Sequence, residues 1–321
     1  MQRAALIGAF VGAFALAVCS VAAKAQDYPT KPVRIIVPYA PGGTIDTLTR
    51  TVAARLSKSL GQSVFIENRP GGAAQIGANS LAQAEPDGYT LGIIGTAHAA
   101  MSKDRKFQYT KELQPVAMVA VVKGLLCVNA TVPANSLKEL IALARSKPGQ
   151  LTYGNAGNLS AGHLAMELFK SEAGIDIVAV PYKGGAPAMQ DLLGGTINMT
   201  ISGPFNSLQN IQDGKLRAIA STGATRSLAA PEVPTFSEAG LLGFELNEWY
   251  GIFAPAKTPK ALVEKLNVEI RRALEDNEVS GTFKRMGSEP GQMSVGEFDQ
   301  FFQSETVHLG NLVTKLGLPL E

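Results

Sequence analysis

Two glycine-rich segments hold the residue types best suited to binding a small anion. Tyr39–Thr44 follows a short apolar run, Val33–Val37, and the segment 154–160 (GNAGNLS) follows Leu151–Tyr153. Each segment opens a predicted helix, whose first amide N–H groups lack partners and whose dipole is positive at that end. A carboxylate is therefore favoured at both places, although a glycine-rich segment by itself also serves simply to join a strand to a helix.

The first segment combines several groups that could contact such a ligand. Gly42 and Gly43 allow close approach to the backbone, Thr44 adds a hydroxyl, and Tyr39 offers a ring and a phenol. Asp46 is expected to cap the following helix rather than to contact an anion, because like charges repel. Neither segment contains an arginine, so recognition is expected to rest on amides, hydroxyls and bridging water.

Two further loops are expected at the same edge of a sheet. Gly95–Ala97 follows the buried run Tyr89–Ile94, and Tyr182–Gly185 follows Ile177–Val180. Ligands of open α/β sheets bind outside the carboxyl ends of the strands, and clefts between domains are favoured sites. These loops are therefore further candidates for the ligand site.

Alternation of apolar runs and amphipathic segments predicts the elements that position the loops. Apolar residues from Ile45 to Leu60 recur at steps of three and four and end at Gly61, which predicts a helix. Such alternation builds parallel sheets covered by helices, so the fold class is α/β. Further strands are predicted at Val64–Ile66, Ile197–Ile201 and Leu216–Ala220, and helices at Ile76–Ala84, from Ser136 to Arg145, from Ser160 onward, at Pro259–Asp276 and at Val295–Lys315.

The number of strands indicates two α/β lobes with a ligand cleft between them. Val119–Asn129 is predicted to be one long strand that crosses from lobe to lobe. The expected lobes are residues 26–126 with 248–321, and residues 127–247. Trp249, at the return to the first lobe, is expected in core or hinge packing.

The N-terminus has the pattern of a secretory signal peptide. Arg3 precedes an apolar run from Ala4 to Ala23, and Ala23-Lys24-Ala25 is an A-x-A cleavage site, so residues 1–25 are expected to be removed. The alternatives are a retained membrane anchor and acylation at Cys19. After cleavage Cys127 is the remaining cysteine, so no internal disulfide is expected.

Charge balance excludes a general attraction to nucleic acid. The whole chain has a net charge of +2, and loss of the leader leaves 27 basic and 27 acidic residues. With no net charge, neither nucleic acid nor an anionic membrane is an expected partner.

At these loops the sequence resembles the periplasmic receptors of tripartite tricarboxylate transporters, the Bug proteins, over nearly the whole mature chain. The matching segments are Val37–Asp46 (VPYAPGGTID), Glu67–Gly72 (ENRPGG), Tyr153–Gly157 (YGNAG), Pro181–Ala188 (PYKGGAPA), Asp191–Gly195 (DLLGG), Gly214–Ala218 (GKLRA), Val233–Thr235 (VPT) and Trp249–Gly251 (WYG).

The resemblance implies a type II periplasmic-binding fold whose two lobes close on a small carboxylate. It also implies a periplasmic location and a membrane permease as partner. We further expect a monomer and no cofactor. The residues expected to bind the ligand are Tyr39, Pro41, Gly42, Gly43, Thr44, Thr96, Ala97, Asn155, Ala156, Gly157, Ser160, His163, Lys183, Gly184 and Ser202.

One segment departs from the family pattern. Relatives often have Val-Asp-Leu followed by another aspartate where this chain has Ile197–Ser202 (INMTIS). The departure implies a cleft that has lost a carboxylate. We therefore expect Ser202 to disfavour a ligand with an ammonium group and to favour plain carboxylic acids over amino acids.

Two other classes of function stay open on the sequence. A ligand-sensing protein that signals to a membrane partner would close on its ligand in the same way. A hydrolase using Ser160 and His163 is less favoured, because Ser160 suits a helix cap and no G-x-S-x-G elbow is present. The chain also lacks the H-E-x-x-H, C-x-x-C, P-loop and G-x-G-x-x-G motifs, so no metal or nucleotide is expected.

Overall fold

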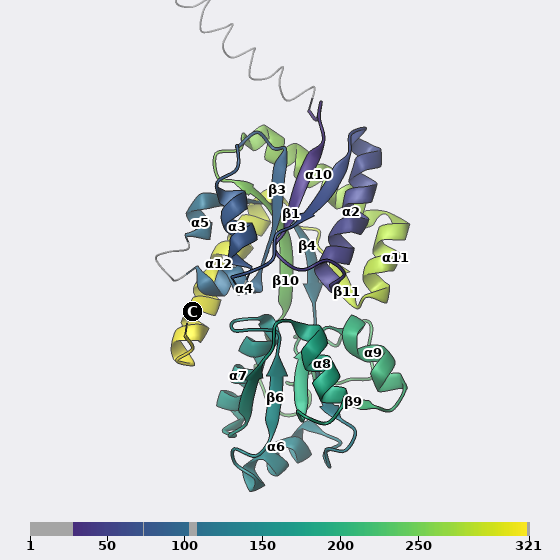
Figure 1. Cartoon of the computed structure of the whole chain (residues 1–321), viewed down its shortest axis with the longest axis vertical. Helices are drawn as coiled ribbons and strands as arrows, with labels where there is room; N and C mark the ends of the chain where they lie inside the picture. The colour runs from purple at the N-terminus through teal and green to yellow at the C-terminus, as the bar shows by residue number, and fades with distance from the viewer. Residues whose placement is uncertain (1–27, 73, 103–107, 320–321) are drawn as a thin grey trace, which may run out of the picture.

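A computed structural model describes residues 28–72, 74–102 and 108–319 and shows two lobes, each built on its own β-sheet (Figure 1). The predicted signal peptide, its cleavage site and Cys19 lie outside the described residues. No helix in the described ranges is both long enough and apolar enough to cross a membrane.

The first lobe is built on a six-stranded sheet of order β11-β4-β10-β3-β1-β2. The strands β1, β2 and β3 are parallel, whereas β10 and β11 run antiparallel to their neighbours. Its strands are β1 (Val33–Val37), β2 (Val64–Asn68), β3 (Thr90–Gly95), β4 (Leu113–Val122), β10 (Glu248–Pro255) and β11 (Ser288–Pro290).

Helices flank this sheet, as the alternating pattern predicted. They are α2 (Thr44–Leu60), α3 (Gln75–Ala82), α4 (Thr96–Met101), α5 (Tyr109–Glu112), α10 (Lys260–Glu275), α11 (Asn277–Arg285) and α12 (Val295–Lys315). The predicted helix at 259–276 is followed by α11, which the sequence reading missed. Asp276 interrupts the helical path and then caps α11 by accepting hydrogen bonds from the N–H groups of Glu278 and Val279.

The second lobe has a five-stranded sheet of order β7-β6-β8-β5-β9. Its strands are β5 (Leu125–Asn129), β6 (Thr152–Asn155), β7 (Val178–Pro181), β8 (Met199–Ser202) and β9 (Leu216–Ser221). Its helices are α6 (Leu137–Ser146), α7 (Ala161–Ala173), α8 (Gly185–Leu193) and α9 (Pro204–Gln212). Ser136 caps α6 as predicted, because its side chain accepts from the N–H of Glu139. The reciprocal bond of a capping box is displaced by one residue, since the Glu139 carboxylate accepts from the N–H of Asn135 instead of Ser136.

The segment predicted as one long crossing strand is two strands. β4 ends at Val122 in the first sheet and β5 begins at Leu125 in the second, with Lys123 and Gly124 between them. A side chain at Gly124 would approach Ile201 to 2.8 Å, so the change of sheet occurs where only glycine fits. The prediction of a continuous strand was therefore wrong, although the chain does change sheets here.

Trp249 packs in the core, as predicted. It is 1% exposed, and its ring meets Phe298, Phe301 and Phe302 of α12 edge-on at centroid distances of 5.4–6.2 Å. Farther along α12, Lys315 forms an ion pair with Glu172 of α7 at 2.9 Å. The last long helix thus contacts both lobes, and Figure 1 shows its C-terminal end beside α7.

Candidate functional site

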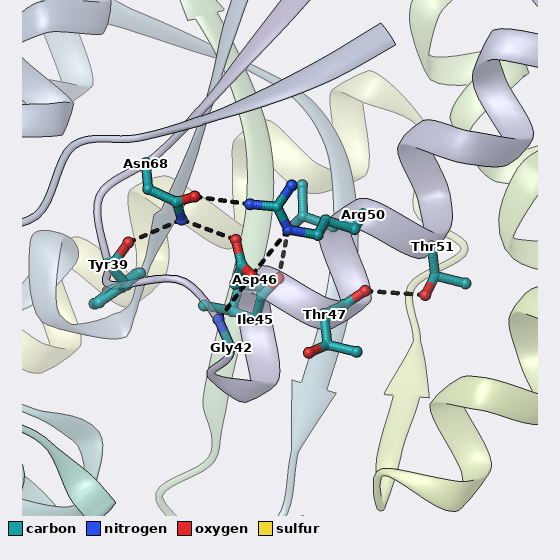
Figure 2. A network of polar contacts seen from close by, with 9 residues as sticks. Tyr39, Gly42, Ile45, Asp46, Thr47, Arg50, Thr51 and Asn68 are labelled. Atoms are coloured by element: carbon teal, nitrogen blue, oxygen red, sulfur yellow. Dashed lines mark hydrogen bonds and ion pairs between the residues drawn. The ribbon is translucent and has the colours of Figure 1, made fainter.

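The loop between β1 and α2 is held by the carboxylate of Asp46 (Figure 2). Asp46 is 2% exposed, and its Oδ2 accepts from the N–H of Gly42 at 2.9 Å and from Nε of Arg50 at 3.0 Å. Its Oδ1 accepts from Nδ2 of Asn68 at 2.8 Å, and the same amide group donates to the carbonyl of Tyr39. The N-cap position is Gly43, without a side-chain cap, so Asp46 fixes the loop instead of capping the helix in the predicted way.

This network leaves the tip of the loop free to bind. Pro41, Gly42 and Gly43 are exposed and Thr44 is half-buried. The N–H groups of Gly43 and Thr44 and the hydroxyl of Thr44 make no hydrogen bond to any other residue that the structure describes. Unpaired donors at the positive end of a 17-residue helix suit an anion.

Tyr39 connects this loop to the strand β10. Its ring lies edge-on to Tyr250 at 6.1 Å and to His98 at 6.4 Å. The phenol of Tyr250 donates to Oε1 of Glu248 at 2.5 Å. Burial, together with the nearby carboxyl of Glu248, raises the pKa of Tyr39, so the phenol remains neutral at physiological pH.

The second loop, between β6 and α7, presents an amide donor without a partner. Oδ1 of Asn155 accepts from the N–H of Gly157 at 2.9 Å, which fixes the side chain as an Asx turn. Asn155 is 2% exposed, and its Nδ2 is buried without a hydrogen-bond partner in the described ranges. A buried unpaired donor is costly, so this group is arranged to meet an acceptor from outside the chain.

Ser160 and His163 stabilise the start of α7. The hydroxyl of Ser160 accepts from the backbone N–H of His163 at 3.3 Å, as a helix cap. Nδ1 of His163 accepts from the N–H of Leu159 at 3.1 Å, and its ring stacks on Tyr153. Burial lowers the pKa of His163, and no hydrogen bond in the described part of the chain joins its ring to Ser160.

The other predicted site residues differ in how much of their surface is free. Thr96 is buried, and its hydroxyl accepts from the N–H of Trp249 at 2.9 Å, so it connects the start of α4 to β10. Ala97 and Gly157 are half-buried, whereas Ala156 and Lys183 are exposed. Gly184 caps α8 at φ 125°, a conformation that only glycine adopts readily. Figure 1 shows the carboxyl end of β6 and the start of α8 on the side of the second lobe that faces the first.

A cavity of about 30 Å³ lies where the two lobes meet, next to these loops. The first lobe contributes Val122 and Glu248, and the remaining lining residues follow or belong to elements of the second lobe. They are Gly124, Ala161, Gly162, Ile201, Ser202, Gly203, Thr222 and Leu246. Of the predicted ligand-binding residues, Ser202 lines this cavity.

Glu248 is the polar residue that the sequence reading missed. Burial raises its pKa, although the hydrogen bond from Tyr250 acts in the opposite direction. Glu248 lines the same cavity as Ser202, so the cavity contains an acid although the segment Ile197–Ser202 contributes none. An acid at the first position of the apolar strand 248–255 (EWYGIFAP) was the available signal, since buried acids are rare away from functional sites.

Clusters of three or more histidine, cysteine or acidic side chains that could hold a metal ion are absent from residues 28–72, 74–102 and 108–319. Cys127 is buried, and burial raises the pKa of its thiol to about 12, so it is unreactive at neutral pH. The chemistry of the site therefore consists of hydrogen-bond donors on the loops and a carboxyl in the cavity.

The site belongs to a chain with well-defined relatives. Residues 48–318 match the family model described as tripartite tricarboxylate transporter family receptor. Protein BugT of Bordetella pertussis is 32% identical over 323 residues, which cover 99% of this chain and 98% of that protein.

Two solved structures carry small dicarboxylic acids in their descriptions. R. palustris Rpa4515 with adipate is 35% identical, with a TM-score of 0.84 over 90% of this chain and 98% of that one. MatC from Rhodopseudomonas palustris with bound malate is 31% identical, with a TM-score of 0.80 over 89% of this chain and 100% of that one.

Proposed function

This chain belongs to the tripartite tricarboxylate transporter receptor family, and we propose that it captures a small organic carboxylate between its lobes and delivers it for uptake. Its two-lobed α/β fold is that of periplasmic binding proteins. Relatives of similar fold hold adipate and malate, which supports a carboxylate as the class of ligand.

The observation that carries the proposal is the unpaired Nδ2 of Asn155, a buried donor. Its partner in the proposed complex is one oxygen of the ligand carboxylate, while the free amides of Gly43 and Thr44 serve the anion from the other lobe. With no arginine in either loop, bridging water completes the contacts. Tyr39, Pro41, Gly42, Ala156, Gly157, Lys183 and Gly184 are proposed to surround the ligand in the same site.

Domain closure follows from this arrangement. The proposed lobes are residues 26–126 with 248–321, and residues 127–247, and the chain passes between their sheets at Lys123–Gly124 and again before Glu248. A ligand that contacts both lobes binds the closed form more tightly and shifts the population toward it.

The family is one of solute-binding receptors, and its members are periplasmic. For this chain we propose export by a signal peptide cleaved after Ala25, a monomeric state and delivery to a membrane permease. Signalling to a membrane sensor is the alternative, since it uses the same closure. Neither catalysis nor a cofactor is part of the proposal.

A thermal-unfolding screen of the exported protein tests the ligand class. Mono-, di- and tricarboxylates, aromatic acids and amino acids are compared, because a ligand at 100 times its Kd stabilises the folded state by about 2.7 kcal/mol. We expect at least one carboxylate to raise the melting temperature. If none does so, and native mass spectrometry finds no co-purified acid, the receptor function is rejected.

Asn155→Asp tests the carrying observation. The substitution keeps the oxygen that accepts from Gly157 but replaces the Nδ2 donor with a second, charged acceptor. We expect it to weaken carboxylate binding by about 100-fold or more, since a charge-assisted hydrogen bond is lost and repulsion is added. Asn158→Asp, on the exposed part of the same loop, is the charge control and should bind almost as wild type.

A further inference from the structure

The polar groups of the inter-lobe cavity have fewer partners than they can take. Oγ of Ser202 is buried and makes no hydrogen bond within the described part of the chain. Oε1 of Glu248 accepts from Tyr250, but its other oxygen receives no hydrogen bond from a described residue. Buried polar groups are normally paired, so these atoms are available to a group that enters from outside.

The cavity wall is connected to both candidate loops through neighbouring residues. On one side its wall is Ala161 and Gly162, in the first turn of the helix that follows the second loop. On the other side Glu248 is joined to Tyr250, whose ring packs on Tyr39 of the first loop. We therefore expect the far end of a ligand whose carboxylate is held by the loops to extend toward this cavity.

We propose that Glu248 and Ser202 form a specificity subsite that takes a hydrogen-bond donor, a hydroxyl or an ammonium group, at the end of the ligand opposite its bound carboxylate. The subsite rests on the proposed carboxylate-binding function and adds to it a requirement on the rest of the ligand. It also reverses the expectation from Ser202 alone, which disfavoured an ammonium group.

The charge of Glu248 selects against a second carboxylate in the subsite. An ionised Glu248 is an acceptor only, and a second carboxylate beside it in a poorly solvated cavity is strongly repelled. Ser202 can accept from the incoming donor or donate to its oxygen.

The test is a set of acids that differ only at the far end. On the carbon skeleton of the tightest carboxylate from the thermal screen, the terminal group is varied between methyl, hydroxymethyl, aminomethyl and carboxylate; for four carbons these are butanoate, 4-hydroxybutanoate, 4-aminobutanoate and succinate. Calorimetry with the wild-type protein is expected to rank the hydroxy or amino acid about 10-fold or more above both others.

Three variants assign the preference to the subsite. Glu248→Gln should reduce the preference over the dicarboxylate by about 10-fold or more, with the larger loss for the amino acid if the donor is an ammonium group. Ser202→Ala should reduce it by a smaller factor, about 3- to 10-fold. Glu245→Gln removes the same charge from an exposed position nearby and should leave the ranking unchanged.

The results separate the subsite from the function on which it rests. If the dicarboxylate binds best to the wild-type protein, or if the ranking is the same in Glu248→Gln and Ser202→Ala, the subsite is overturned while the receptor function stands. If no carboxylate of any class binds, the receptor function fails and the subsite fails with it. Melting temperatures show whether each variant is folded, and Ser202→Ala provides the test if Glu248→Gln is not.

Discussion

The carboxylate of Asp46 accepts a hydrogen bond from the backbone N–H of Gly42 at 2.9 Å, four residues earlier in the chain. This contact closes the first loop on itself and occupies the N–H of Gly42, whereas the N–H groups of Gly43 and Thr44 have no partner among the described residues. The carboxylate of Asp46 is thus engaged by Gly42, Arg50 and Asn68, and these hydrogen bonds fix the conformation of the loop.

Asp46→Asn should destabilise the folded protein by about 1–3 kcal/mol at neutral pH, because the added NH₂ group leaves one of three donors without its acceptor. Burial raises the pKa of Asp46, but the hydrogen bonds from Arg50, Gly42 and Asn68 outweigh it and hold the pKa below 3.8. Urea unfolding of both proteins measures the difference.

The pH dependence of this difference has a defined sign. A lowered carboxyl pKa stabilises the folded state above the unfolded value, and that contribution is lost as the pH falls below about 3.8. The stabilities of wild type and Asp46→Asn should therefore converge in that acidic range. A difference that stays constant from pH 7 to pH 3 would contradict the role of the ionised carboxylate.

Thr44→Ala should weaken carboxylate binding by about 10-fold, since it removes a hydroxyl that has no hydrogen-bond partner among the residues the structure describes. Thr44→Ser keeps that hydroxyl and should restore most of the affinity. Calorimetric titration gives the Kd of each. Equal affinity of all three proteins would remove Thr44 from the site.

Gly43→Leu should abolish measurable binding without unfolding the protein. Its φ of −74° suits any residue, and the nearest atom to an added Cβ is the carbonyl oxygen of Ala40 at 4.0 Å, so the side chain projects into the ligand space. Gly296→Leu, at an exposed position of α12 with no atom within 4 Å, is the matched control. Normal binding by Gly43→Leu would place the ligand elsewhere.

His98 should make the protein less stable as the pH falls from 6.5 to about 4. Its side chain is fully buried, and burial lowers its pKa to about 4 despite hydrogen-bonding contacts with the backbone of Ala74 and Gly95. In this range His98 binds a proton in the unfolded chain but not in the folded protein. The free energy of unfolding therefore decreases as the pH decreases.

The expected size of the His98 effect is roughly 3 kcal/mol, which corresponds to the lowering of its pKa from 6.5 to about 4. His98→Asn cannot titrate and should show a shallower decline over the same range. The comparison is made by urea unfolding at pH 7, 5.5 and 4. Parallel curves for the two proteins would show that His98 does not titrate in this way.

Local patterns predicted much of this architecture because they depend on neighbours in the chain. The spacing from Ile45 to Leu60 identified α2, and Ser136 with Glu139 identified the start of α6. The break at Lys123–Gly124 was not visible, since an apolar run reads the same whether it serves one sheet or two.

The same distinction between local patterns and contacts of distant segments applies to the site. Both loops could be located from glycine and strand patterns, and Asn155 was included as a loop residue before its unpaired Nδ2 was known. Glu248 was missed because it and Ser202 line the same cavity although they are 46 residues apart in the sequence. No local pattern encodes this proximity. The assignment of Asp46 as a helix cap failed for a similar reason, since its partner Asn68 comes from β2.

Calorimetric titration of the exported wild-type protein and Asn155→Asp, with the tightest carboxylate from the thermal screen, tests the central claim most directly. We expect one ligand per chain for the wild type and a Kd about 100-fold or more higher in the variant. Binding of equal strength in both proteins would contradict a carboxylate site that includes Asn155.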